Sequence, residues 1–223
     1  MSAMYQPRPP SDRTRVAAAP SLLAQVLGIT AIGFLITACA AYVFKNVPPI
    51  MGIVGSLGGL ALLFAMSGAR GNPQVQLLLF YAFTFLEGIG IAPMISRYTG
   101  LYGSGIVVDA ATTTGLGMLI LGAIAYAFSF DWRKLSGIAF GALIALLVVG
   151  LISAFTHFLH PGVYAWLTLG VFSLLTLVDF ARIRGASGGY GANAVDLAVS
   201  IYLDAINIFI ALLSIFGGRS RSR

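Results

Sequence analysis

Seven long apolar runs, separated by short polar breaks, restrict this chain to one class of fold. They lie at about residues 21–44, 50–66, 77–95, 110–128, 135–155, 163–181 and 195–216. Each run approaches the roughly 17–25 residues that a helix needs to span the hydrocarbon of a bilayer. A membrane β-barrel would instead show short segments of alternating polarity. The pattern predicts an all-α integral membrane protein with seven transmembrane helices.

The composition agrees with a membrane location. Only 9% of the residues are charged and 58% are hydrophobic, whereas an ordinary soluble domain is about one-quarter charged. The net charge of +6 comes from thirteen Lys and Arg residues, and these lie almost wholly between the apolar runs and at the two ends. Such a distribution reports membrane topology. We therefore expect a lipid bilayer around the chain and no nucleic-acid partner.

The chain divides into one transmembrane domain and two tails. Residues 1–20 are rich in Pro, Arg and small residues without apolar periodicity, which predicts a flexible cytosolic tail. The transmembrane domain is expected at 21–217, followed by a basic tail at 218–223. Residues 36–39 resemble a lipoprotein cleavage box ending at Cys39, but the apolar run is longer than a signal core and continues past the cysteine. We expect the first helix to be retained.

The loop charges predict the orientation. With a cytosolic N-terminus, the outer loops hold only Lys45 and Arg97, while the inner segments hold the remaining loop cations. The tail with Arg219, Arg221 and Arg223 disagrees, because seven complete spans would place it outside. Either the last run does not cross completely, or its tail is translocated against the rule.

Two aspartates inside apolar runs are the candidate functional residues. Asp179 lies late in the sixth run and Asp204 lies in the middle of the seventh. An acid at membrane depth costs roughly 2.5–3.5 kcal/mol on insertion scales, so it usually serves function and faces the bundle interior. The intervening loop is short enough to make the two helices antiparallel neighbours. Two adjacent carboxylates cannot both ionise cheaply, so the pair is expected to share a proton and respond to pH.

Other polar residues are weaker candidates. Asp179 alone is also explained as a helix-end residue paired with Arg182 or Arg184. Ser200 and Asn207 lie four and three residues from Asp204 on the same helical face. We expect four accessory polar residues around the site: Glu87, Asp196, Ser200 and Asn207.

Glycines recur within the apolar runs, as at Gly52, Gly55, Gly58 and Gly59, and at Gly115 and Gly117. Small residues at such spacing let helix backbones approach closely in membranes. We predict a packing role for both groups.

Three segments resemble the Bax inhibitor-1 family. The segment IYLDAINIFIALLSIFG resembles the family's final-helix signature, LYLDFINLFLxLLxILG, while FYAFTFLEGIGIAPMISRY and LVDFARI resemble its third and sixth helices. The resemblance implies a bundle with the seventh helix at its centre, wrapped by the other six. It also implies that Asp179 and Asp204 match the paired aspartates of calcium-leak members, and that Arg70 matches an arginine that latches the sixth-helix aspartate. Phe180, Ala181 and Asp196 depart from the family pattern.

The resemblance implies a pH-sensitive calcium leak. Calcium prefers six to eight oxygen ligands, so Asp179 and Asp204 would form only a weak site, which suits passage. We expect Ca²⁺ as the transported ion, no tightly bound cofactor, no enzymatic activity, and a monomer in a bacterial inner membrane with its N-terminus in the cytosol. One alternative is a non-transporting regulator of a membrane stress or protease partner. The other is an intramembrane aspartyl protease, although the GxGD and Pro-Ala-Leu motifs of that class are missing.

Overall fold

The computed structural model describes residues 21–129, 131–186 and 193–220. These residues form seven helices, each long and apolar enough to cross a membrane. The predicted seven-helix membrane fold is therefore confirmed. The tail predicted at 1–20 and residues 221–223 of the predicted basic tail lie outside the described residues. The helices are α1 (Leu22–Val43), α2 (Pro49–Gly68), α3 (Pro73–Tyr102), α4 (Gly105–Ala127), α5 (Trp132–Thr156), α6 (Pro161–Ala186) and α7 (Ala194–Ser220).

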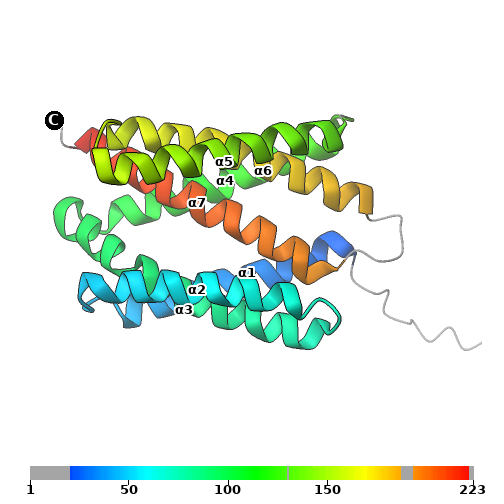
Figure 1. Ribbon diagram of the computed structural model, residues 1–223, viewed down its shortest axis with the longest axis horizontal. Coiled ribbons are helices and arrows are strands. Elements are labelled where there is room, and N and C mark those ends of the chain that lie inside the picture. Colours follow the sequence, from blue (N-terminus) through cyan, green and yellow to red (C-terminus); the bar gives the residue numbers. More distant parts are fainter. Residues whose placement is uncertain (1–20, 130, 187–192, 221–223) are drawn as a thin grey trace, which may run out of the picture.

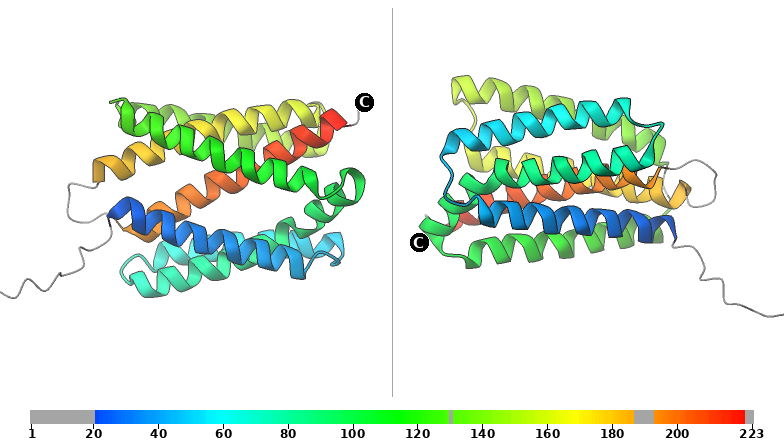
Figure 2. Two further views of the ribbon diagram at one scale, coloured as in Figure 1. Left: turned by 180° about the vertical axis from the view of Figure 1, so that it is seen from behind. Right: turned by 90° about the horizontal axis from the view of Figure 1, so that it is seen from below.

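Helix α7 lies at the centre of the bundle. Helices α1 to α3 form one group and α4 to α6 another, and α7 crosses obliquely between them (Figure 1). Figure 2 shows the same oblique crossing from behind. Helix α7 packs directly against α1, α3, α4 and α6, while α2 packs on α3 and α5 packs on α6. Over half of its span is buried, the largest share of any helix, which confirms the predicted central position.

Local capping makes several helices longer than the apolar runs. Helix α3 was expected at 77–95 but begins at Pro73, because the side chain of Asn72 accepts hydrogen bonds from the first free backbone N–H groups. It ends at Tyr102, and the capping residue Gly103 has a φ of 81°, which suits a residue without Cβ. Asp131 caps α5 in the same way. Capped ends are polar, so hydropathy alone does not detect them.

The length of α7 bears on whether the last helix crosses completely. It contains 27 residues, or about 40 Å at ~1.5 Å per residue, which exceeds the hydrocarbon thickness of roughly 30 Å. It ends at the end of the bundle opposite to the start of α1 (Figure 1). Helix α7 is therefore long and apolar enough to cross the membrane completely.

An aromatic cluster fixes α7 next to the aspartate of interest. Tyr202 is fully buried, and its ring packs against Phe34 of α1 and against Phe80 and Phe83 of α3. Its hydroxyl is hydrogen-bonded to the Thr37 hydroxyl at 2.6 Å. Asp204 lies two positions after Tyr202 on the same helix, so this anchor also sets the position of that acid.

Glycines allow α2 and α1 to approach α3. A Cβ added at Gly55 would lie 2.7 Å from the backbone nitrogen of Gly90, and one at Gly88 would lie 2.5 Å from the Thr37 carbonyl oxygen. The predicted packing role is therefore confirmed for the α2 glycines. It is wrong for Gly115 and Gly117, where an added Cβ would meet nothing within 4 Å. Both lie on faces of α4 that no neighbouring helix covers closely.

This difference predicts that Gly55→Leu destabilises the protein and Gly117→Leu does not. Overpacking a close contact typically costs about 1–3 kcal/mol. Thermal unfolding in detergent should therefore show a clearly lower midpoint for Gly55→Leu. Equal midpoints for the two variants would contradict the close α2–α3 contact.

Candidate functional site

Both predicted aspartates are buried where α6 meets α7. Asp179 is 7% exposed and Asp204 is 4% exposed. The two helices pack along one another, and the two carboxyl groups are near enough to interact electrostatically. The site therefore combines two acidic groups within one helix interface.

Asp179 is paired with an arginine of its own helix. The Arg182 guanidinium donates a hydrogen bond from Nη1 to Asp179 Oδ1 at 2.8 Å. Ser200 of α7 also lies beside this carboxylate. Within the described part of the chain, no hydrogen bond joins Asp179 to Asp204. The helix-end interpretation of Asp179, paired with Arg182, describes this conformation.

Asp204 has an unpaired oxygen. Its Oδ2 atom is buried and has no hydrogen-bond partner among the residues that the structure describes. Thr176 of α6 lies beside the carboxyl group, but its hydroxyl donates to the Phe172 carbonyl oxygen at 2.8 Å. A buried polar atom without a partner costs free energy. Binding of a proton or a cation at this oxygen would remove that cost.

The expected contact between Arg70 and Asp179 is absent from the described residues. Arg70 Nε instead lies 3.9 Å from Asp196 Oδ1; the Arg70 side chain is largely exposed and that of Asp196 is partly exposed. Arg70 occupies the turn after α2, at the same end of the bundle as the first turn of α7. Arg182 lies one helical turn from Asp179 and already forms an ion pair with its carboxylate. This contact gives Asp196 a structural partner that the sequence did not reveal.

A buried amide extends the Asp196 cluster. Gln76 of α3 is 1% exposed; its amide nitrogen donates to Asp196 Oδ1 and its amide oxygen accepts from Asn193. Asn193 in turn accepts from the Val195 backbone N–H at 2.9 Å. Sequence reasoning missed Gln76, although a glutamine beside an apolar run was a visible signal. The cluster ties the start of α7 to α3.

The remaining accessory residues are distributed around the bundle. Glu87 lies against Gly59 and near Tyr202, in the α2–α3 region. Asn207 donates to the Leu203 carbonyl oxygen of its own helix at 2.8 Å. Of the four accessory candidates, Ser200 lies beside Asp179.

A polar cleft of about 380 Å³ opens between α2, α3, α6 and α7. Ser200 and Arg182, which both interact with Asp179, form part of its wall. Beyond Asp204, α7 enters an apolar cluster that includes Ile208, Leu212 and Leu213. The aspartate pair therefore has polar surroundings toward one end of the bundle and an apolar barrier toward the other.

Comparison with known proteins now decides the family. A family model described as "Inhibitor of apoptosis-promoting Bax1" matches residues 19–221. The chain belongs to the Bax inhibitor-1 family. The match extends over almost the whole sequence, so the resemblance seen in three segments is confirmed for the complete membrane domain.

Bacterial relatives support the same assignment. The chain is 31% identical over 198 residues to an uncharacterized membrane protein of Vibrio cholerae, with 86% of this chain and 85% of the relative covered. It is 33% identical over 172 residues to one of Streptococcus pyogenes, covering 71% and 70%. An uncharacterized protein of Caulobacter vibrioides is 26% identical over 241 residues, and 94% of each chain is covered. The protein is thus an integral membrane protein with bacterial homologues.

The Asp196 cluster predicts a stability difference between two neighbouring glutamines. Gln76→Leu leaves Asp196 and Asn193 without their buried amide partner, which should cost about 1–3 kcal/mol. Gln74 is exposed, so Gln74→Leu should have little effect. Thermal unfolding in detergent and hydrogen exchange in the first turns of α7 measure both. Unchanged protection of these turns in Gln76→Leu would refute the anchoring role.

Proposed function

We propose that this Bax inhibitor-1 family protein is a pH-sensitive calcium leak of a bacterial inner membrane, with Asp179 and Asp204 in the ion path. The unpaired, buried Oδ2 atom of Asp204 carries the proposal. An acid at this depth is costly and usually functional. A cation passing along the α6–α7 interface would meet an oxygen that has no hydrogen-bond partner among the described residues.

The ligand set suits passage better than storage. Calcium takes six to eight oxygen ligands, and Asp179 and Asp204 supply carboxylates beside the hydroxyls of Ser200 and Thr176. Among the described residues, no group of three or more His, Cys, Asp or Glu is arranged to hold a metal ion. Water would complete the coordination shell. A weak site of this kind lets an ion enter and leave, and calcium is then the cargo rather than a resident cofactor.

The pair between Arg182 and Asp179 acts as the latch in this proposal. While Arg182 holds Asp179, a positive charge lies beside the path and opposes a cation. Protonation of Asp179 removes the attraction and frees Arg182. Protonation of Asp204, in contrast, removes the charge that attracts calcium. These opposite effects make the leak depend on pH. Arg70, which the family resemblance suggests as the latch, pairs with Asp196 here.

The apolar cluster beyond Asp204 forms the second barrier. Ile208, Leu212 and Leu213 are all buried there, and an apolar constriction excludes ions because it dewets. The proposal therefore assigns this conformation to the closed state. Opening requires a movement of α7 relative to α6 that separates these side chains.

The first test neutralises the central acid. Asp204→Asn keeps the size of the side chain but removes its charge, so calcium flux into liposomes containing the purified protein should fall at least about tenfold, the equivalent of ~1.4 kcal/mol. Asp109→Asn, on an exposed surface of α4, serves as the matched control and should leak like the wild type.

Wild-type flux in Asp204→Asn would exclude an ion path through this acid. Failure of the wild-type protein itself to leak calcium would instead favour the alternative function, regulation of a membrane stress or protease partner without transport.

The second test removes the latch. Arg182→Gln leaves Asp179 without its cation, so the leak should be faster at neutral pH and its response to acidification should weaken. Arg97→Gln, an exposed arginine on α3, is the control. A slower leak, or an unchanged pH profile, would show that the ion pair does not gate the path. Stopped-flow measurement with an encapsulated calcium indicator resolves both quantities.

A further inference from the structure

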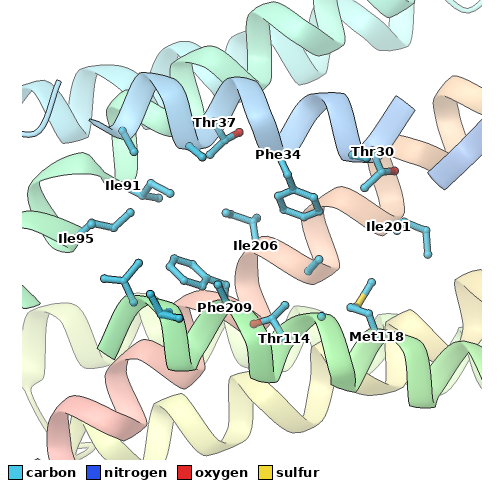
Figure 3. A pocket seen from close by; sticks show the side chains of 18 of the residues that line it. Thr30, Phe34, Thr37, Ile91, Ile95, Thr114, Met118, Ile201, Ile206 and Phe209 are labelled. Carbon is cyan, nitrogen blue, oxygen red and sulfur yellow. The ribbon is translucent and has the colours of Figure 1, made fainter. Parts of the chain in front are cut away.

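A large crevice opens along the side of the bundle, away from the aspartates. It lies between α1 and α4, with α7 at its base, and has a volume of about 1350 Å³. Helices α1 and α4 do not pack on each other. Figure 3 shows side chains from both helices and from α7 pointing into the space between them. The two three-helix groups therefore leave a gap on this side, which α7 does not close.

The walls of the crevice are almost entirely apolar. Phe34, Ile91, Ile95, Met118, Ile206 and Phe209 line it (Figure 3). Leu27 and Leu119 also line it, and both are exposed beyond 40%, so the crevice opens sideways toward the hydrocarbon of the membrane. An apolar cavity does not hold water stably, and empty space loses dispersion contacts. Its occupant must be apolar along most of its length.

One end of the crevice carries a positive charge. Lys45 is the only charged residue among the described residues that line it. Its ammonium group lies 4.7 Å from the centre of the Tyr42 ring, which holds it near the crevice. The hydroxyl-bearing residues Ser96, Thr99 and Ser104 line the crevice as well. A cation with neighbouring hydroxyls is suited to a phosphate group.

We propose that the crevice binds one anionic phospholipid, with an acyl chain between α1 and α4 and the phosphate at Lys45. An apolar slot with a single cationic end matches the amphipathic chemistry of such a lipid. Basic sites between transmembrane helices recognise lipid headgroups through the same attraction. A helix from a second copy of the chain would fill apolar space but would supply no headgroup for Lys45.

The bound lipid would touch side chains that position the α6–α7 interface. Thr37 lines the crevice and is hydrogen-bonded to the hydroxyl of Tyr202 at 2.6 Å. Met118 also lines it, and its sulfur lies 3.7 Å from the hydroxyl oxygen of Thr176, which lies beside Asp204. The site itself is independent of calcium transport, and its test requires no flux.

Native mass spectrometry of the full chain tests the headgroup contact. The protein is equilibrated in vesicles of equal phosphatidylglycerol and phosphatidylcholine content and then released into mild detergent. The wild type should retain one phospholipid and should prefer phosphatidylglycerol about fivefold. One lysine near a membrane surface contributes an attraction of about this size. Lys45→Ala should retain a lipid without that preference. Lys134→Ala, the other lysine of the chain, should behave like the wild type.

A second pair of variants tests the acyl-chain slot. Gly115 lines the crevice, and an added Cβ there meets nothing within 4 Å, so Gly115→Phe should fill the slot without disturbing a neighbour and should reduce lipid retention at least fivefold. Gly117 has the same open surroundings but does not line the crevice. Gly117→Phe is therefore the matched control and should retain lipid normally.

Four results would overturn the proposal. The wild type could emerge without lipid, or Gly115→Phe could retain as much lipid as Gly117→Phe. A dimer that Gly115→Phe abolishes would instead assign the crevice to a second copy of the chain. An unchanged phosphatidylglycerol preference in Lys45→Ala would refute the position of the headgroup.

Discussion

Burial of two carboxyl groups at membrane depth is the constraint on which the rest of this structure depends. Asp179 and Asp204 are both almost completely buried, although lipid neither solvates a charged carboxylate nor supplies hydrogen-bond partners for it. Arg182 offsets part of the cost at Asp179, whereas Asp204 keeps an unpaired oxygen. The bundle tolerates this by placing α7 at its centre, where neighbouring helices exclude lipid from the acid. The Tyr202 cluster and the Gln76 network then hold α7 in place at two levels.

The architecture also separates three environments around α7. One end of the bundle offers a polar cleft beside Asp179, and the region beyond Asp204 is an apolar seal. The crevice between α1 and α4 forms a third environment, lined by hydrocarbon side chains and open to the membrane. Each environment contacts a different face or level of the same helix. A small displacement of α7 would therefore alter ion access, the seal and lipid contact together, which is how the proposed leak and the proposed lipid site would influence one another.

Much of the fold could be predicted because membrane spans have a strong length and composition signal. The same signal marked Asp179 and Asp204, since acids inside apolar runs are rare. Lateral partners were harder to predict. A helix that is apolar on all sides does not indicate which face meets a neighbour. The sequence therefore predicts the same packing role for Gly55, which contacts α3, and for Gly115, which does not. For the same reason, Arg70 was expected at Asp179, whereas its position in the turn after α2 brings it to Asp196.

We propose that Asp179 and Asp204 form one pH-responsive unit. Infrared difference spectroscopy in lipid measures this directly, because a protonated carboxyl group has its own carbonyl stretching band. We predict a carboxyl band that changes with pH in the wild type, disappears or shifts in Asp204→Asn, and is also altered in Asp179→Asn, since coupled groups titrate together. A wild-type spectrum without any pH-dependent carboxyl band, or bands for the two acids that respond independently, would contradict it.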